Sequence, residues 1–313
     1  SINLSPYLNS STNYKFFTME SMFSNCSLLE TINLGTFNAP LLDSTNSMFY
    51  NCSNLTSIDM KILKTNYLRT TAGMFSSCSS LTSIDLGGFV TKNVITMDNM
   101  FESCSVLASI TWDESFDTTN VCDMNCMFYN CSALTSLNLK NFNTQNVVNF
   151  SNMFYGCGDL KTIFNMNFST INAINFDDMF SGCGSLLFLD LSSFNMKNAQ
   201  NITNFLNVGS GDLKYLCTPR FFNYANYSDG FGSADTLQSA NGNSLNDLSS
   251  SGALSYSEAY IADDSNLERI SISSVTVDGS IDSCFGAYTN SQGSFYVYNG
   301  LFNKYMFPLE YGN

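Results

Sequence analysis

The chain has 313 residues, a formal net charge of −14 and 44% hydrophobic residues. This content is enough for a sizeable core, and the length predicts about two domains. The acidic balance argues against nucleic acid or an anionic membrane surface as a partner, because both require clustered Lys and Arg. The sequence contains no histidine, which removes Ser-His and Cys-His hydrolases and His-ligated metal centres. We therefore expect a non-enzymatic protein without a cofactor.

Residues 1–21 are polar and precede the first complete repeat. Met19 stands three residues before Met22, as Met97 does before Met100, so this segment already ends in half a repeat. The end coil of a stack would otherwise expose its core to water. We therefore expect residues 1–21 to form an N-terminal cap.

A Met-Phe pair recurs at nearly constant spacing through residues 22–213. The pairs begin at positions 22, 48, 74, 100, 127, 153 and 179, so the period is 26 residues with one step of 27. A degraded eighth copy begins at Phe205. A cysteine follows each methionine by four residues: Cys26, Cys52, Cys78, Cys104, Cys131, Cys157 and Cys183. A fixed period of about 20–50 residues is the signature of a solenoid.

Each repeat has apolar residues at fixed offsets from its cysteine: Leu at +3, Ile or Leu at +6, mostly Leu at +8 and mostly Phe near +11. The alternation from +6 to +8 predicts a short strand with one face in the core. The Met, Cys and Leu before it, spaced by four and three, predict a single helical or 3₁₀ turn. The fold class is therefore an α/β-type solenoid, leucine-rich-repeat-like, with one short parallel strand per repeat.

The L-x-x-I/L-x-L core, with M-F-x-x-C before it and F-[ND]-T-x-N-V after it, resembles the BspA-like leucine-rich repeat family of bacterial and some protist surface proteins. The fullest match runs from Met127 to Leu139 and on through Phe142 to Val147. The resemblance covers residues 16–213, about two thirds of the chain. It implies a right-handed solenoid exposed at a surface and used for adhesion or partner binding. It carries over no catalytic residues.

The seven repeated cysteines are predicted to form an unpaired, buried ladder. Stacked side chains point the same way and not toward each other, which disulfide geometry disfavours. A buried free cysteine behaves as a small hydrophobe. Cys217 and Cys284 form a possible disulfide in an oxidising compartment. The fourth repeat adds Cys122 and Cys126, whose pairing the sequence leaves open.

Four carboxylates crowd the same region of the fourth repeat: Asp113, Glu114, Asp117 and Asp123. A cation site is one interpretation, but the spacing matches no calcium-binding loop. The favoured interpretation is a bulged turn with solvated carboxylates, so no metal site is predicted.

Positions +5 and +7 of the predicted strands must face outward, because residue +6 faces the core. They are small and polar in the first repeats and become apolar at Phe164 and Phe188. Flat polar ladders bind weakly, so Phe164 and Phe188 with nearby Met166 are the favoured contact for the C-terminal part or for a partner. The candidate binding residues are Phe164, Met166, Phe188, Asp59, Asp85 and Asp190.

From residue 214 the period is lost, and residues 214–313 are predicted to form a separate, aromatic-rich, mostly β module. Residues 271–277 and 294–298 alternate as strands do. The eighth repeat has Gly209 where the cysteine should be, so the last coil needs a cover. We expect residues 215–231 to pack on the last coils and provide it.

Together these patterns predict a non-enzymatic surface protein that mediates adhesion or protein or glycan binding through its solenoid and C-terminal module. Few Lys, many Ser, Thr and Asn, and no apolar run near the roughly 20 residues of a membrane-spanning helix favour an extracellular, cell-surface or virion-surface location. One alternative is a structural subunit of a filament, sheath or virion that packs on copies of itself. The other is a carbohydrate-active enzyme using carboxylates such as Asp263 and Asp264.

Overall fold

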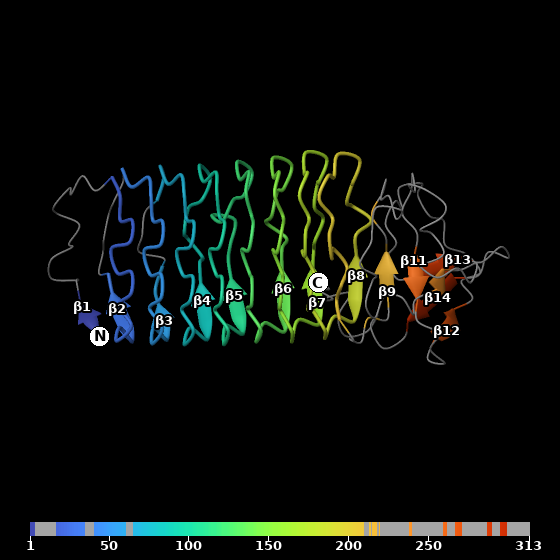
Figure 1. Cartoon of the computed structure of the whole chain (residues 1–313), viewed down its shortest axis with the longest axis horizontal. Coiled ribbons are helices and arrows are strands. Elements are labelled where there is room, and N and C mark those ends of the chain that lie inside the picture. The colour runs from blue at the N-terminus through green and yellow to red at the C-terminus, as the bar shows by residue number, and fades with distance from the viewer. Residues whose placement is uncertain are drawn as a thin grey trace, which may run out of the picture.

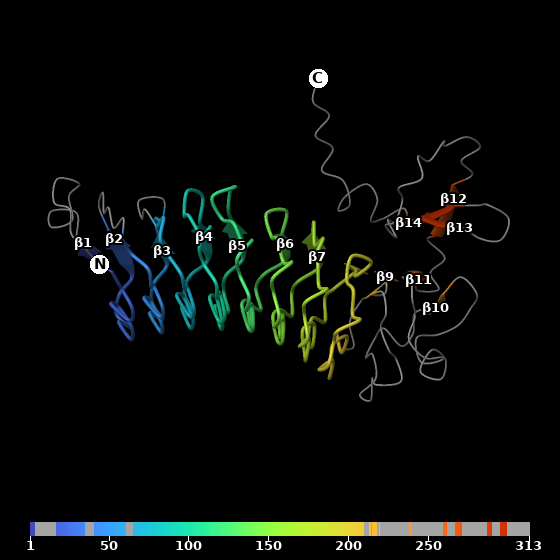
Figure 2. The same ribbon diagram turned by 90° about the horizontal axis from the view of Figure 1, so that it is seen from above.

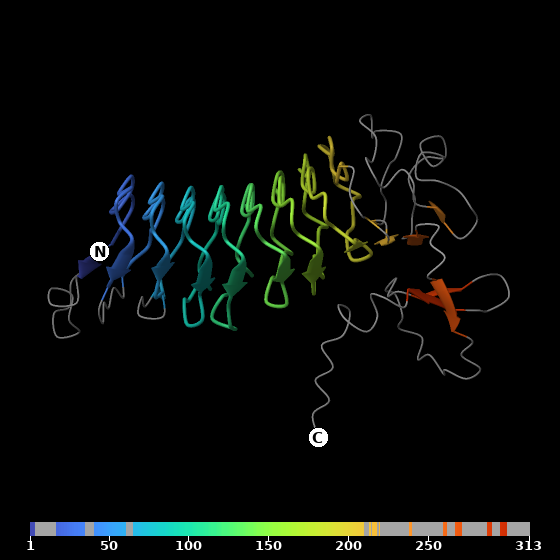
Figure 3. The same ribbon diagram turned by 90° about the horizontal axis from the view of Figure 1, so that it is seen from below.

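The computed structural model describes residues 1–3, 17–34, 41–60 and 65–209, together with 213, 215–217, 219 and the backbone of five further strands. Within these ranges the repeats form coils that follow one another in a single row along the longest axis (Figure 1). The views from above and below show the same row (Figures 2 and 3). The predicted repeat solenoid is confirmed.

Each repeat contributes one short strand. The strands are β1 (Ile2–Asn3), β2 (Thr31–Asn33), β3 (Ser57–Ile58), β4 (Ser83–Asp85), β5 (Ser109–Thr111), β6 (Ser136–Asn138), β7 (Thr162–Phe164), β8 (Phe188–Asp190) and β9 (Tyr215–Cys217). Strands pair in parallel at equal repeat positions, as Ile84 does with Ile110. In β2, β4 and β6 the central residue is buried between two exposed ones. This is the pattern predicted for strands with one face on the core.

The most continuous hydrogen bonding between coils is made by another stretch of each repeat. This stretch is eight residues long and runs from four residues before the methionine to three residues after it. We call this stretch the Met-Phe arc; 44–51 is one example. At each of the seven junctions, four backbone N–H groups of one arc donate to four carbonyls of the next, at N···O distances of 2.7–3.3 Å. Strand pairing is interrupted by comparison, since β5 and β6 belong to different sheets. The arcs therefore bind the row together from end to end.

The arc is not the helical or 3₁₀ turn that the sequence pattern predicted. It does contain turn hydrogen bonds, such as Tyr50 N–H to Ser47 C=O at 3.0 Å. However, the residues before each methionine and before each cysteine have positive φ, 52° at Ser47 and 56° at Asn51. A left-handed residue interrupts right-handed helical geometry, so successive turns cannot continue into a helix. The described residues contain neither an α-helix nor a 3₁₀-helix.

The core consists of columns of like residues. Rings from Phe23 to Phe180 stack one on the next, with centroids 5.4–5.8 Å apart and interplanar angles of 4–13°. Beside them, Met100 and Leu107 are fully buried, as are most of their counterparts in other repeats. Each ring within the stack is covered by the repeats on both sides, so an isolated repeat would leave both faces of its ring exposed.

The F-[ND]-T-x-N-V motif supplies polar contacts at the corner after the strand. Thr118 is buried, and its Oγ1 donates to the Asn143 carbonyl at 2.9 Å and accepts from the Asn143 N–H at 2.8 Å. Asn120 reaches the other way, because its Nδ2 donates to the Lys92 carbonyl at 2.8 Å. Equivalent bonds occur at other threonines and asparagines of the motif. The motif therefore ties each corner to both neighbouring coils.

The strand row is extended at both ends. Ile2 of β1 pairs in parallel with Ile32 and packs against the core. At the other end β9 pairs in parallel with β8, while β11 (Ala259–Ile261) joins β9 in antiparallel orientation, followed by β10 (Gln238–Ser239). The start of the predicted 215–231 cover therefore does pack on the last coil. Residues 220–231 lie outside the described residues.

The remaining strands are β12 (Leu267–Ile270), β13 (Ala287–Thr289) and β14 (Phe295–Tyr298), in an antiparallel sheet of order β12-β14-β13. β14 lies within the strand predicted over 294–298, whereas 271–277 lies outside the described residues. The division into a cap (1–21), a solenoid (22–213) and a β module (214–313) stays a prediction.

Replacing Thr118 by valine should lower the free energy of unfolding by about 1–3 kcal/mol, because the isosteric change removes the buried hydroxyl that makes two hydrogen bonds to the Asn143 backbone. Urea denaturation followed by circular dichroism measures the change. Thr82 is exposed, so Thr82→Val is the matched control and should have little effect. Equal stabilities for the two variants would contradict the role assigned to the buried threonines.

Deleting residues 214–313 should destabilise the coils or cause aggregation. The deletion removes β9 with its fully buried Leu216 and leaves the edge of β8 unpaired. Thermal melts and light scattering of the 1–213 fragment test this, with a chain that ends at residue 219 and keeps β9 as the control. A 1–213 fragment that is soluble, monomeric and as heat-resistant as the whole chain would refute the expectation.

Candidate interaction surfaces

Five consecutive strands, β2 to β6, present two rows of exposed short polar side chains, which we call the strand face. The rows are Thr31, Ser57, Ser83, Ser109 and Ser136 at position +5, and Asn33, Asp59, Asp85, Thr111 and Asn138 at position +7. Adjacent strands of a sheet lie about 4.8 Å apart. Hydroxyl, amide and carboxylate groups therefore repeat at short intervals wherever neighbouring strands pair, with a break between β5 and β6.

The three predicted aspartates lie on or near this face. Asp59 and Asp85 are exposed and adjacent, joined by an isolated parallel bridge. Asp85 also accepts a hydrogen bond from the Gly87 N–H at 2.9 Å, and Asp190 accepts one from the Ser192 N–H at 2.9 Å. Asp85 and Asp190 thus stabilise the turn after their strands, and Asp190 is only half-exposed.

The strand face changes character at β7 and β8, as predicted. Thr162 is buried, and Phe164 and Phe188 are half-buried at outward positions. The prediction for Met166 is wrong, because only 7% of this residue is exposed. Asn165 is exposed with φ 57°, so the residue after it turns inward and occupies the core in place of the usual +8 leucine. Met166 is therefore a core residue and not a surface contact.

The ladder cysteines are unpaired at all seven positions and buried at six of them. The exception is Cys26, which is half-buried. Each of the six donates its S–H to the phenylalanine carbonyl of the preceding coil, at 3.0–3.2 Å. The same carbonyl also accepts the cysteine N–H of its own coil. The ladder cysteine is thus a hydrogen-bond donor as well as a small apolar residue.

Burial raises the pKa of Cys52 to about 11 and those of Cys104 and Cys157 to about 12. The thiolate is the reactive form of cysteine, so these thiols stay protonated and inert at neutral pH. Cys122 is exposed and Cys126 half-buried, and both are free. The possible Cys217–Cys284 bridge stays a prediction, because Cys284 lies outside the described residues.

The extra residue of the fourth repeat lies between Trp112 and Phe116, because β5 is still in register with β4. The two rings stack with centroids 5.4 Å apart. The Asp113 carboxylate accepts the N–H groups of Gly88 at 3.1 Å and Ser115 at 2.9 Å, and these bonds lower the pKa of Asp113. Among the described residues no three His, Cys, Asp or Glu side chains form a group that could hold a metal. The extra residue forms the bulged turn that was predicted, but Asp117 and Asp123 are only partly exposed, and the absence of a metal site stays a prediction.

A tyrosine column was missed by the sequence analysis. Tyr129 and Tyr155 stack with centroids 4.8 Å apart and planes 7° from parallel, and both are partly exposed. Tyr50 holds the same repeat position and is 41% exposed. The recurrence of tyrosine directly after Met-Phe in three repeats was the available signal. Such exposed rings offer flat faces to sugars or to cationic side chains.

The DUF285 family, described as a Mycoplasma protein of unknown function, matches residues 17–113 and again residues 106–211. The chain belongs to this family. The two matches together span the coils, and with the observed parallel strands they confirm the resemblance to BspA-like leucine-rich repeat surface proteins. No curated protein matches the chain.

Two solved structures are similar. A leucine-rich repeat protein from Bacteroides ovatus is 16% identical, with a TM-score of 0.25 over 56% of this chain. A leucine rich cell surface protein from Faecalibacterium prausnitzii is 14% identical, with a TM-score of 0.24 over 64% of this chain. The chain spans 58% of the first protein's length and 85% of the second's. These superpositions are too loose to compare individual positions.

No segment of the described chain forms a helix with the length and apolarity needed to cross a membrane.

Alkylation of the native protein at pH 8 should be fast at Cys122 and slow at the six buried ladder cysteines, which should react only after denaturation. Iodoacetamide labelling followed by peptide mass spectrometry measures each site, and Cys122 serves as the internal control. Disulfides between successive ladder cysteines would show that the stacking geometry is wrong.

Proposed function

We propose that this protein is a non-enzymatic surface protein whose solenoid binds a glycan or an extended protein segment through the strand face. The observation that carries the proposal is the pair of exposed polar rows at equal repeat positions over five successive strands. Ser, Thr, Asn and Asp are short, so ordering them on binding costs little side-chain entropy. Hydroxyl, amide and carboxylate groups hydrogen-bond to sugar hydroxyls and to backbone amides alike.

The frame beneath these rows favours binding of a repeating or extended ligand. Four inter-arc hydrogen bonds per junction and the stacked phenylalanines keep adjacent coils in a fixed relation. A ligand whose own groups repeat can therefore engage several coils at once, and contacts that are weak singly act together. The half-buried Phe164 and Phe188 provide an apolar end to the same face.

A location outside the cell or at its surface is part of the proposal. It is supported by the resemblance to BspA-like surface proteins and by the Faecalibacterium protein, which is described as a cell surface protein. The strongly acidic composition suits a solvent-exposed protein that does not associate with anionic surfaces.

The two alternatives differ in what they require. A structural subunit would form ordered polymers, whereas the proposed binding protein would be monomeric in solution, so sedimentation analysis separates them. A carbohydrate-active enzyme would need carboxylates such as Asp263 and Asp264, which lie outside the described residues. Sugar release that is lost on changing either carboxylate would favour this enzyme.

The binding proposal is tested with a variant carrying Ser83→Lys, Ser109→Lys and Ser136→Lys, which places three long cations on the strand face. The wild type should bind members of a glycan array or a panel of immobilised extracellular-matrix proteins, and the variant should lose about tenfold or more in affinity.

The matched control carries Gln145→Lys, Val148→Lys and Ile171→Lys, three exposed positions away from the strands with the same change in charge. It should bind as the wild type does, and both variants should melt as the wild type does. Binding that survives in the strand-face variant, or that is lost equally in the control, would exclude the strand face as the binding surface.

A further inference from the structure

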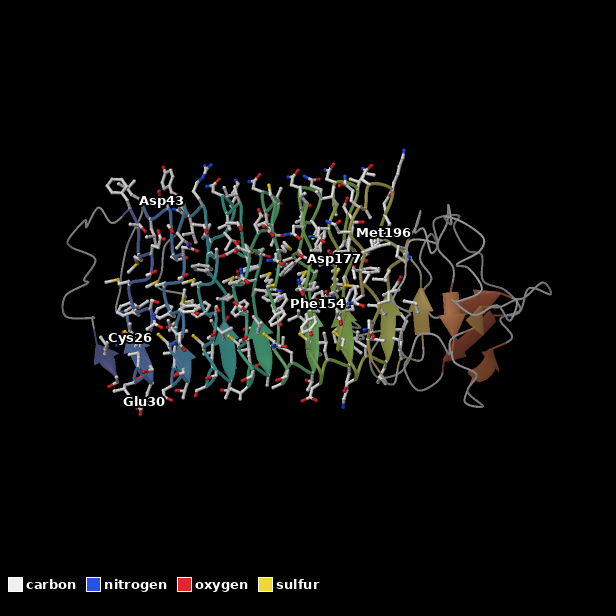
Figure 4. All side chains as sticks on the ribbon, in the orientation of Figure 1. Cys26, Glu30, Asp43, Phe154, Asp177 and Met196 are labelled. Atoms are coloured by element: carbon white, nitrogen blue, oxygen red, sulfur yellow. The ribbon has the colours of Figure 1, made fainter. Side chains whose placement is uncertain are left out.

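The first Met-Phe arc, residues 18–25, differs from the later arcs in being open to solvent. Met22 is 45% exposed, whereas the methionines at the same position in the next six repeats are fully buried. Phe17, just before this arc, is 59% exposed. Cys26 follows the arc at the N-terminal end of the row (Figure 4). Among the described residues, none covers the side of this coil that faces away from the array, where Met22 is exposed.

The backbone of the first arc is also incomplete. In each later arc four carbonyls accept N–H groups from the preceding coil, as those of Ser44, Asn46, Met48 and Tyr50 do. Within the described residues, no backbone N–H donates to the corresponding carbonyls of the first arc. These are the carbonyls of Thr18, Glu20, Met22 and Ser24. The N-terminal end of the row therefore presents four carbonyl acceptors with the same spacing as those that accept N–H groups at the other junctions.

The thiol of Cys26 lacks the contact that defines the ladder. The other six ladder thiols donate to the phenylalanine carbonyl of the coil before them, as Cys52 does to Phe23 at 3.0 Å. No such coil precedes Cys26 in the described part of the chain. One face of the Phe23 ring likewise has no ring on it there, while its other face stacks on Phe49 at 5.4 Å.

The strand side of the same end is already occupied. β1 pairs with β2 in the register of a preceding repeat, Ile2 with Ile32. The sequence around β1, Ser-Ile-Asn-Leu at 1–4, matches Thr-Ile-Asn-Leu at 31–34, which are repeat positions +5 to +8. β1 therefore stands where the strand of a coil belongs. The arc of such a coil comes before its strand in the chain, as arc 70–77 comes before β4.

We infer that the open side of arc 18–25 is a docking surface for one further Met-Phe arc, a segment with the same M-F pattern joined directly before β1. This arc brings four N–H donors for the four carbonyls, a phenylalanine ring for Phe23 and a carbonyl for the Cys26 thiol. The coil–coil interface seen at seven junctions then continues for an eighth.

A second copy of the chain does not fit this surface. Two copies joined through it about a two-fold axis would place acceptor row against acceptor row, with no donors between them. A head-to-tail contact would bring the eighth arc, 201–208, onto this surface. That arc has Leu206 at the position of the stacked phenylalanine and Gly209 at the position of the cysteine, so it lacks the ring that would stack on Phe23.

The test places a second copy of residues 70–82, which carry an arc, its cysteine and the link to a strand, directly before Ser1. This length puts Ser1 in the position that Ser83 has in its own repeat. Alkylation of Cys26 by iodoacetamide should become about tenfold slower than in the unextended chain, as expected when a thiol moves from an open coil end into a packed interface.

The control extension has the same length, with its Met and Phe both replaced by Ser, and should leave Cys26 as reactive as before. Cys104 reports in the same digest whether the array is folded. Equal Cys26 rates with the two extensions would overturn the inference. Fast Cys104 alkylation in the extended chain would overturn it too, because an arc that fits cannot unfold the coil it covers.

Discussion

Backbone hydrogen bonds between Met-Phe arcs are the interaction on which the rest of the structure depends. They exist because left-handed residues before each methionine and each cysteine turn alternate N–H groups out of the coil and toward the next one. Ser, Asn and Gly at most of these positions tolerate that conformation at modest cost. Once the arcs are in register, identical side chains meet, and the phenylalanine stack and the thiol ladder follow from that register.

Much of this fold could be predicted from the sequence because its signals are periodic. The constant spacing of Met-Phe and Cys predicted the coil. The Ile-x-Leu alternation predicted a strand whose central residue is buried, as Ile84 is. The helical turn was predicted wrongly because a spacing of three and four is shared by helices and by consecutive turns. The position of Ser47 or Asn51 within the arc was the evidence against it, since both favour turns over helix interiors.

The candidate surface was less predictable, because side-chain direction depends on where each strand ends. Met166 lies one residue beyond a left-handed Asn165. The polar Asn165 at core position +8, with an apolar residue after it, was the available signal for that slip. The roles of the carboxylates were even harder to predict from the sequence. Asp113 and Asp85 look equally available in the sequence, yet both hold backbone N–H groups of nearby turns. Whether a polar residue serves a ligand or the chain itself is decided by contacts between coils, which a single sequence does not display.

The repeats differ from one another mainly at the corner between the strand and the F-[ND]-T-x-N-V motif. The additional residue beside Trp112 and the slip at Asn165 both fall there, and the arcs on either side keep their full set of inter-coil bonds. A change of length at this corner therefore leaves the hydrogen bonds between neighbouring arcs unchanged. The corner is a natural insertion point: a foreign loop placed between residues 112 and 116 would project from the array without shifting the register of its neighbours.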